Sequence, residues 1–191
     1  MKLVGEQKIS ATREVVFEAL NDIEVLKQSI PGCEEIIKIS DTEMTAIVVL
    51  KVGPVKARFK GSVRLSNLNP PESYTISGEG KAGPAGGAKG GADVQLVADG
   101  DITILKYDVS ANIVGKFAQL GSRLIDSTAK KLATQFFAEF AAIVESKTES
   151  QDGSENAQIA KPAPDRSILG KPAIWVAIAV IVAAIMVTLL N

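Results

Sequence analysis

Few residues of this chain could do chemistry, and histidine is not among them. Histidine is the commonest general base and metal ligand, so its absence removes the Ser-His and Cys-His nucleophile arrangements. Cys33 is the only cysteine, which excludes an internal disulfide, and we expect it to be a small buried apolar residue. Glu34 and Glu35 are adjacent, and neighbours on a strand face opposite ways, which discourages acid–base cooperation. We therefore expect no catalytic residue, no metal site and no covalent cofactor.

The glycine-rich segment 78–91, GEGKAGPAGGAKGG, holds seven of the chain's sixteen glycines. Gly83 and Lys89 have the spacing of the outer Gly and Lys of a phosphate-binding Walker A loop. Ala88 stands where that motif needs its second glycine, and Gly90 stands where it needs Ser or Thr. The segment also lies between strands, with no helix behind it to receive a phosphate. We expect a flexible hairpin connection, or alternatively a mobile flap or docking loop.

Basic residues alternate with apolar ones in residues 55–65, which predicts a strand with one basic face. This row is either a solvated outer face or a docking strip for an acidic partner or anionic headgroups. The partner-docking residues that we expect are Lys56, Arg58, Lys60, Gly86, Gly87 and Lys89. The formal net charge of −1 argues against a nucleic-acid partner.

The elements that would position these residues lie within residues 1–145. Alternation and β-branched residues predict strands over residues 2–9, 42–52, 55–65, 73–78, 92–97 and 102–113. Thr12 and Asp22 are suitable N-caps for two short helices after the first strand. From 116 to 144, apolar residues recur every third or fourth position, which predicts a long amphipathic helix. The expected fold class is α+β, with a curved antiparallel sheet wrapped around the last helix.

One helix cannot fill the concave face of such a sheet, so we expect an apolar cavity at its open end. Gly121 marks either a ligand-filled gap or a tight helix–sheet crossing, whereas Phe136 and Phe140 are expected to fill the core. The cavity residues that we expect are Phe17, Leu20, Leu26, Ile30, Phe59, Val63, Phe117, Leu120, Gly121, Leu124 and Ile125.

Residues 173–190 read AIWVAIAVIVAAIMVTLL, without a charge. As a helix they would span about 27 Å, close to the hydrocarbon thickness of a bilayer. The segment lacks the polar face of a core helix, so we expect a transmembrane anchor. Residues 146–172 are polar and predict a flexible linker. Positive residues precede the span and no signal peptide is seen, so we expect a tail-anchored protein whose domain lies on the cytoplasmic face of the cytoplasmic membrane.

Four runs of sequence resemble the CoxG family of carbon monoxide dehydrogenase subunits. They are IPGCEEI (30–36), KVGPVKARFKG (51–61), GGAKGGADV (86–94) and LGSRLIDSTAKKLATQFF (120–137), in collinear order within about residues 1–143. The resemblance implies the START/Bet v 1-like helix-grip (SRPBCC) fold. It also implies a hydrophobic ligand such as a lipid, sterol or polyketide between the sheet and the helix.

The resemblance further implies association with molybdenum hydroxylases of the carbon monoxide dehydrogenase type. We expect a non-enzymatic, membrane-anchored accessory protein that recruits such an enzyme to the membrane. It would carry a quinone (menaquinone or ubiquinone) or another hydrophobic ligand and link the enzyme to the quinone pool. A general lipid-binding or lipid-transfer domain without a redox partner remains an alternative. An enzyme is a third possibility, because some helix-grip proteins catalyse cyclisations.

Overall fold

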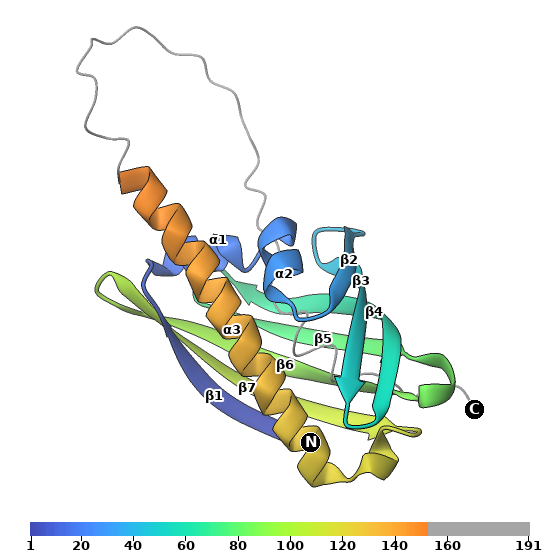
Figure 1. Cartoon of the computed structure of the whole chain (residues 1–191). Helices are drawn as coiled ribbons and strands as arrows, with labels where there is room; N and C mark the ends of the chain where they lie inside the picture. The colour runs from blue at the N-terminus through green and yellow to red at the C-terminus, as the bar shows by residue number, and fades with distance from the viewer. Residues whose placement is uncertain (153–191) are drawn as a thin grey trace, which may run out of the picture.

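Seven strands form one antiparallel sheet in the computed structural model, which describes residues 1–152 of the chain (Figure 1). The strand order is β1-β7-β6-β5-β4-β3-β2, so β1 and β2 are the two edges. The strands are β1 (Lys2–Ile9), β2 (Cys33–Lys38), β3 (Glu43–Val52), β4 (Val55–Asn69), β5 (Ser73–Lys81), β6 (Gly87–Asp99) and β7 (Ile102–Val114). This is the curved antiparallel sheet that the sequence predicts.

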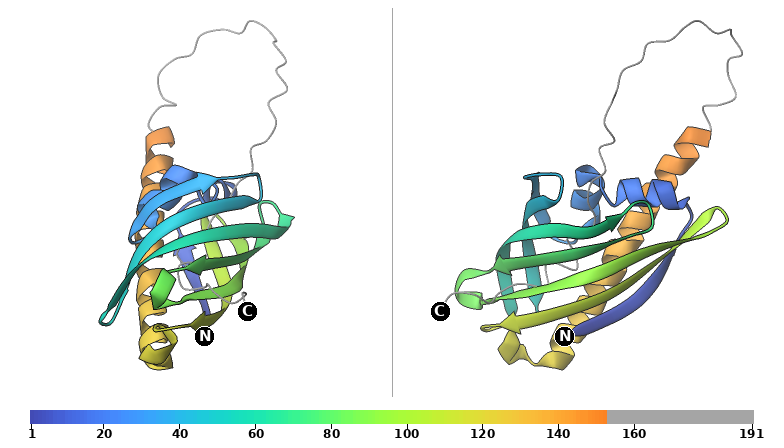
Figure 2. Two further views of the ribbon diagram at one scale, coloured as in Figure 1. Left: turned by 90° about the vertical axis from the view of Figure 1, so that its right-hand side faces the viewer. Right: turned by 180° about the vertical axis from the view of Figure 1, so that it is seen from behind.

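Three helices cover the concave face of the sheet. The short helices α1 (Arg13–Ala19) and α2 (Ile23–Ser29) follow β1, and the long helix α3 (Ser122–Asp152) crosses the face (Figures 1 and 2). Asp22 caps α2, because its carboxylate accepts a hydrogen bond of 2.9 Å from the Glu24 N–H. Among the described residues, no helix is both long and apolar enough to cross a bilayer. The predicted transmembrane segment 173–190 lies outside the described residues.

Helix α3 begins and ends later than the sequence predicts. Gly115 and Gly121 both have positive φ, of 77° and 85°, which stops the helix from extending back to residue 116. The residues between them form a connector that contains the 3₁₀ turn η2 (Ala118–Leu120). At the other end, α3 continues through residues 146–152, which we expected to belong to the linker. The Thr148 hydroxyl donates to the Val144 carbonyl there, so polar residues are accommodated on the helix.

The glycine-rich segment is mostly strand, not the flexible connection that we expected. Residues 78–81 belong to β5 and residues 87–91 to β6, and the two stretches pair in regular register. Only residues 82–86 connect them, and these contain the 3₁₀ turn η1 (Gly83–Ala85). The backbone ladder therefore orders this segment despite its glycine content.

The best-filled part of the interior lies where α1 and α2 meet the second half of α3. Phe136 and Phe140 are fully buried there, as predicted, and their rings stack at 5.6 Å between centroids. We call this the α1–α2 end of the domain. The opposite end carries the β3–β4 turn, η1, η2 and the start of α3, toward the lower right of Figure 1.

Candidate ligand-binding site

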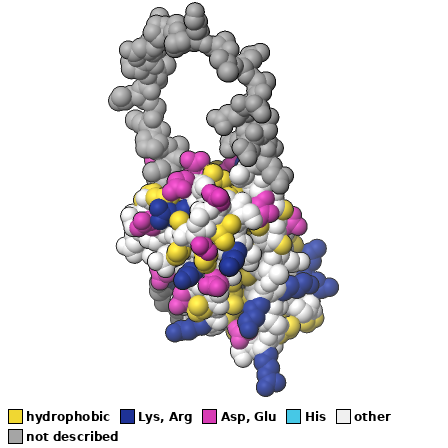
Figure 3. Space-filling view, turned by 90° about the vertical axis from the view of Figure 1, so that its left-hand side faces the viewer, with side chains coloured by type: hydrophobic (Ala, Val, Ile, Leu, Met, Phe, Trp, Pro, Cys, Tyr) yellow, Lys and Arg dark blue, Asp and Glu magenta, His cyan; other side chains and the backbone are white. Residues whose placement is uncertain are grey.

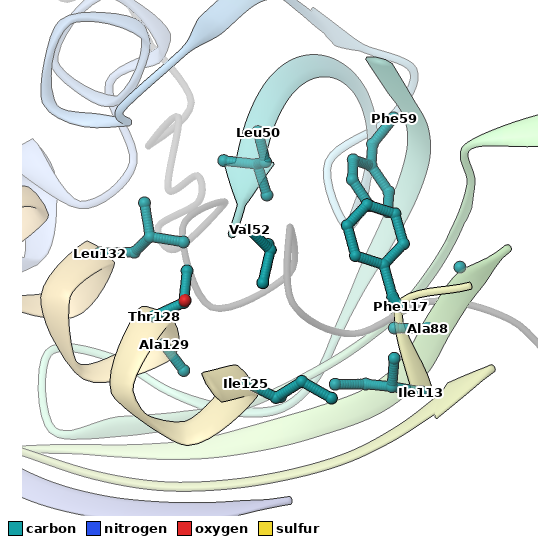
Figure 4. A pocket seen from close by; sticks show the side chains of 11 residues that line it. Leu50, Val52, Phe59, Ala88, Ile113, Phe117, Ile125, Thr128, Ala129 and Leu132 are labelled. Atoms are coloured by element: carbon teal, nitrogen blue, oxygen red, sulfur yellow. The ribbon is translucent and has the colours of Figure 1, made fainter. Parts of the chain in front are cut away.

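An apolar pocket lies at this opposite end, between the first turns of α3 and the sheet (Figure 4). We call this the pocket end. The lining comes from β3, β4, β6, β7, the connector before α3 and α3 itself. It consists of Leu50, Val52, Phe59, Gly87, Ala88, Ile113, Phe117, Ile125, Thr128, Ala129 and Leu132.

Small residues on the central strands explain why space remains here. Phe59 and Val63 are buried, and the alternation of β4 places Gly61 on the same, inward face. In register, Gly61 stands opposite Gly80, and Gly80 stands opposite Ala88. Of the strands, β1 and β3 near the two sides approach α3 most closely. The central strands thus present bare backbone where the helix is further away.

Thr128 is the only polar side chain in the lining, and its hydroxyl is already committed. It donates to the Leu124 carbonyl at 2.8 Å, within α3. The lining therefore offers no general acid or base, and the described residues contain no group of carboxylates and thiols that could hold a metal ion. The pocket can bind apolar matter but has no means to transfer a proton.

The cavity volume in this conformation is about 40 Å³. That is room for one or two water molecules, well below the roughly 300–1,000 Å³ of ordinary ligand pockets. The Phe59 and Phe117 rings close it, with centroids 5.2 Å apart. The connector that carries Phe117 lies between two glycines with positive φ, Gly115 and Gly121. An organic ligand would need this connector and the start of α3 to move outward.

Comparison with known proteins identifies the family. The model of the CoxG family, named for a subunit of carbon monoxide dehydrogenase, matches residues 5–145, which is most of the chain. The chain belongs to the CoxG family. No curated protein matches this CoxG-family chain.

Solved structures share its fold. A conserved protein from Geobacillus kaustophilus is 25% identical with a TM-score of 0.72, and the match covers 76% of this chain and 96% of that one. A START superfamily protein from Mycobacterium smegmatis is 14% identical, with a TM-score of 0.53 and coverage of 74% and 98%. The ZhuI aromatase/cyclase from Streptomyces sp. R1128 is 12% identical, with a TM-score of 0.58 and coverage of 78% and 95%. The CoxG family and this fold generally provide binding domains, while the cyclase is an enzyme on the same fold.

The structure brings three of the expected cavity residues to the pocket: Phe59, Phe117 and Ile125. The Gly87 backbone, expected on a docking surface, joins them in the lining. The remaining expected residues lie elsewhere. Four are buried beneath or within α1 and α2, one lies further along β4, and two are half-buried near the start of α3. They are Phe17, Leu20, Leu26, Ile30, Val63, Leu120 and Leu124.

Gly121 serves neither of the two roles that we expected. It is exposed, and a Cβ atom added there would meet nothing within 4 Å. It borders no ligand-filled gap and no tight crossing. Its φ of 85° and ψ of 149° are the reason for glycine, since other residues rarely adopt this backbone conformation.

Sequence reasoning missed seven lining residues of this CoxG-family domain. They are Leu50, Val52, Ala88, Ile113, Thr128, Ala129 and Leu132. The alternation in β3 and β7 and the helical spacing in α3 already give an inward face to most of them. Nothing local indicates which inward-facing residues border the gap, because that depends on strand register.

The expected docking residues divide into paired and unpaired ones. Lys56, Arg58 and Lys60 are exposed on the outer face of β4. The Arg58 guanidinium donates to a Glu34 carboxylate oxygen at 2.6 Å, whereas Lys56 and Lys60 have no ion pair among the described residues. Lys89 is exposed opposite Glu79 on β5. Gly86 lies in the β5–β6 connection with a φ of 99°.

Cys33 is half-buried rather than fully buried as expected. Burial is the main cause that raises the pKa of its thiol, which is the opposite of what an activated nucleophile needs. The thiol contacts the Glu35 carbonyl at 3.7 Å. This cysteine therefore has the character of a structural residue at the edge of the sheet.

Proposed function

We propose that this CoxG-family protein is a non-enzymatic accessory protein that recruits a carbon monoxide dehydrogenase-type molybdenum hydroxylase to the cytoplasmic membrane. In this proposal it carries a quinone, or another hydrophobic ligand, in the pocket beside α3 and links the enzyme to the quinone pool. The proposed anchor is the segment 173–190, with the folded domain on the cytoplasmic side.

The apolar pocket carries the proposal. Its lining holds one hydroxyl and no ionisable group, which suits a ligand that partitions from a membrane. The family adds the hydroxylase, since its name refers to a subunit of carbon monoxide dehydrogenase. The small cavity of this conformation requires that the ligand displaces the connector and the first turns of α3.

Ligand binding is tested with the purified full chain by solvent extraction, mass spectrometry and titration with menaquinone and ubiquinone. Ala129→Leu fills the pocket and should abolish binding. Ala138→Leu is the matched control, because Ala138 is exposed on the same helix. Both variants need melting curves, since overpacking at Ala129 costs about 1–3 kcal/mol. Equal quinone affinity of the two folded variants would contradict this site.

Recruitment is tested by pull-down with the full chain from a lysate that contains the hydroxylase. The expected result is a captured protein with bound molybdenum, and its loss from the membrane fraction when residues 171–191 are deleted. Capture without molybdenum, or membrane retention of the truncated chain, would contradict the corresponding part of the proposal.

One observation favours a second candidate, a general lipid-binding or lipid-transfer domain without a redox partner. Because Thr128 donates to Leu124, the lining has no free donor for a quinone carbonyl. A competition between menaquinone and a fatty acid distinguishes the two. Strong preference for the quinone supports the accessory role, and equal binding supports the lipid-binding alternative.

A further inference from the structure

The pocket end of the domain carries a group of exposed cations, which we call the basic pole. Every chain connection at this end has a lysine or arginine within two residues of it: the β3–β4 turn, the β5–β6 connection and the connector before α3. The basic pole consists of Lys51, Lys56, Lys60, Lys81, Lys116 and Arg123, all exposed.

Two pairs of like charges stand directly opposite each other within the basic pole. Lys51 is in register with Lys56 across the β3–β4 pair, and Lys60 is in register with Lys81 across the β4–β5 pair. Like charges in opposed positions destabilise a sheet. The nearest acidic side chains compensate little, since Glu79 faces Lys89 and one Asp126 carboxylate oxygen is buried.

No cation of the basic pole forms an ion pair within the described part of the chain. The basic residues that do form them lie elsewhere: Arg13, Lys38, Arg58, Arg64 and Lys147. The basic pole therefore keeps its charge available, at some cost in repulsion. An external anion would relieve that repulsion.

The connections at the α1–α2 end have the opposite charge. Asp41 lies in the β2–β3 turn, Glu72 in the β4–β5 turn, and Asp99 and Asp101 flank the β6–β7 turn. Asp22 lies between α1 and α2. Figure 3 shows magenta side chains concentrated near the end where α3 leaves the domain and dark blue ones toward the other end. The domain is thus electrostatically polar along the length of α3.

We infer that the basic pole docks on an anionic lipid bilayer, with the pocket end facing the membrane. Each lysine or arginine close to an anionic membrane strengthens binding, and the acidic end is turned away from the negative surface. The inference goes beyond the proposed function, because it assigns the domain itself a membrane-contacting surface in addition to the predicted anchor. It holds whichever ligand the pocket carries.

A lipid surface fits the arrangement better than an acidic protein. The cations surround loop tips that carry small and apolar residues, Pro54 and Pro84 among them, and both prolines are exposed. Half-buried Leu120 lies in the third connection. Apolar tips ringed by lysines match the headgroup boundary, where apolar side chains enter and lysines stay at the phosphates. A hydrophobic ligand could then pass between the bilayer and the pocket without crossing water.

The predicted anchor permits this orientation although α3 ends at the far pole. The 31 residues of α3 span roughly 46 Å. Residues 153–172 could reach at most about 70 Å if fully extended. The chain is long enough for the predicted anchor and the pocket end to meet the same membrane.

The test measures amide hydrogen exchange of the full chain in vesicles without quinone or hydroxylase. One set of vesicles is phosphatidylcholine alone, and the other adds phosphatidylglycerol. Exchange at residues 53–54, 82–86 and 115–121 should slow in the anionic vesicles and recover at high salt. The triple variant Lys51→Gln, Lys56→Gln, Lys81→Gln should reduce the docked population about a hundredfold, at about fivefold per removed cation.

The matched control neutralises Lys8, Lys27 and Lys106, which are exposed outside the basic pole, and it should leave protection in the anionic vesicles nearly unchanged. Equal exchange in both kinds of vesicle would overturn the inference, as would an equal loss in the control. Protection of the same three segments by soluble polyglutamate, as strong as that by vesicles, would also overturn it in favour of an acidic protein partner. None of these outcomes depends on quinone binding or on the hydroxylase.

Discussion

The two ends of the interior are built from the same strands and the same helix, yet one is core and the other is a candidate site. At the α1–α2 end, large side chains such as Leu96, Leu105 and Phe140 meet and exclude solvent completely. At the pocket end, Gly61, Gly80 and the small side chain of Ala88 face the helix. The size of the inward-facing residue, more than the fold, decides whether space remains for a ligand.

The same division runs along α3. Its inward-facing residues change from Ala129 and Ala133 in the first half to Phe136 and Phe140 in the second. The short helices α1 and α2 then cover only the second half. Additional protein is thus placed where the interior is already filled, and the pocket is left with a single connector as its cover.

Truncation at the α1–α2 end should have the largest effect on stability. Phe140→Ala removes a fully buried ring and should lower the free energy of unfolding by about 3–5 kcal/mol, measured by chemical denaturation. Ile125→Ala, at a half-buried pocket position, should cost clearly less. Equal losses would mean that the pocket end is ordinary core, and the contrast between the two ends would fail.

The closure of the pocket end can be tested at two glycines with similar backbone conformations. A Cβ added at Gly86 would clash with the Val114 carbonyl, whereas one at Gly121 would meet nothing. Gly121→Ala should cost about 1 kcal/mol from backbone strain alone, and Gly86→Ala about 3 kcal/mol or more. Thermal melting of both variants measures the difference. A milder effect at Gly86 would mean that the β5–β6 connection yields easily and does not seal the pocket.

The parts of the fold that the sequence predicted depend on local periodicity. Phe59 inward and Lys56 outward follow from alternation within one strand, and the register of β4 agrees. The start of α3 was predicted wrongly because Phe117 and Leu120 keep helical spacing in a segment that two glycines exclude from the helix. The pocket could not be located, since Gly61, Gly80 and Ala88 become neighbours only through pairing across three strands.

Tyr74 is an exception within the filled end. Its hydroxyl is buried without a partner, and burial raises its pKa far above the ordinary value. Its ring packs edge-on against Phe17. Tyr74→Phe removes an unsatisfied polar group and should raise the free energy of unfolding by about 1 kcal/mol. A destabilised variant would indicate that the hydroxyl finds a partner in solution, and that the filled end holds a water or ligand.

The smallest effect concerns the polar link between α2 and α3. Burial raises the pKa of Asp22, but hydrogen bonds from Lys147 and from the Glu24 and Val25 N–H groups outweigh it, so the pKa lies below its ordinary value. A depressed pKa contributes stability that is present above the unfolded-state pKa of about 3.9 and is lost as pH falls through the lower folded value.

Asp22→Asn keeps a capping oxygen for α2 but removes the charge that pairs with Lys147 at 3.0 Å. The pair is largely exposed, so the loss at neutral pH should be only about 0.2–1 kcal/mol. The difference between wild type and variant should vanish below the folded-state pKa of Asp22, because the carboxyl is then uncharged as well. Asp22→Ala loses the cap too and should cost about 1 kcal/mol at every pH. If Asp22→Asn and Asp22→Ala were equally destabilised at neutral pH, the charge on Lys147 rather than the cap would hold α2 against α3.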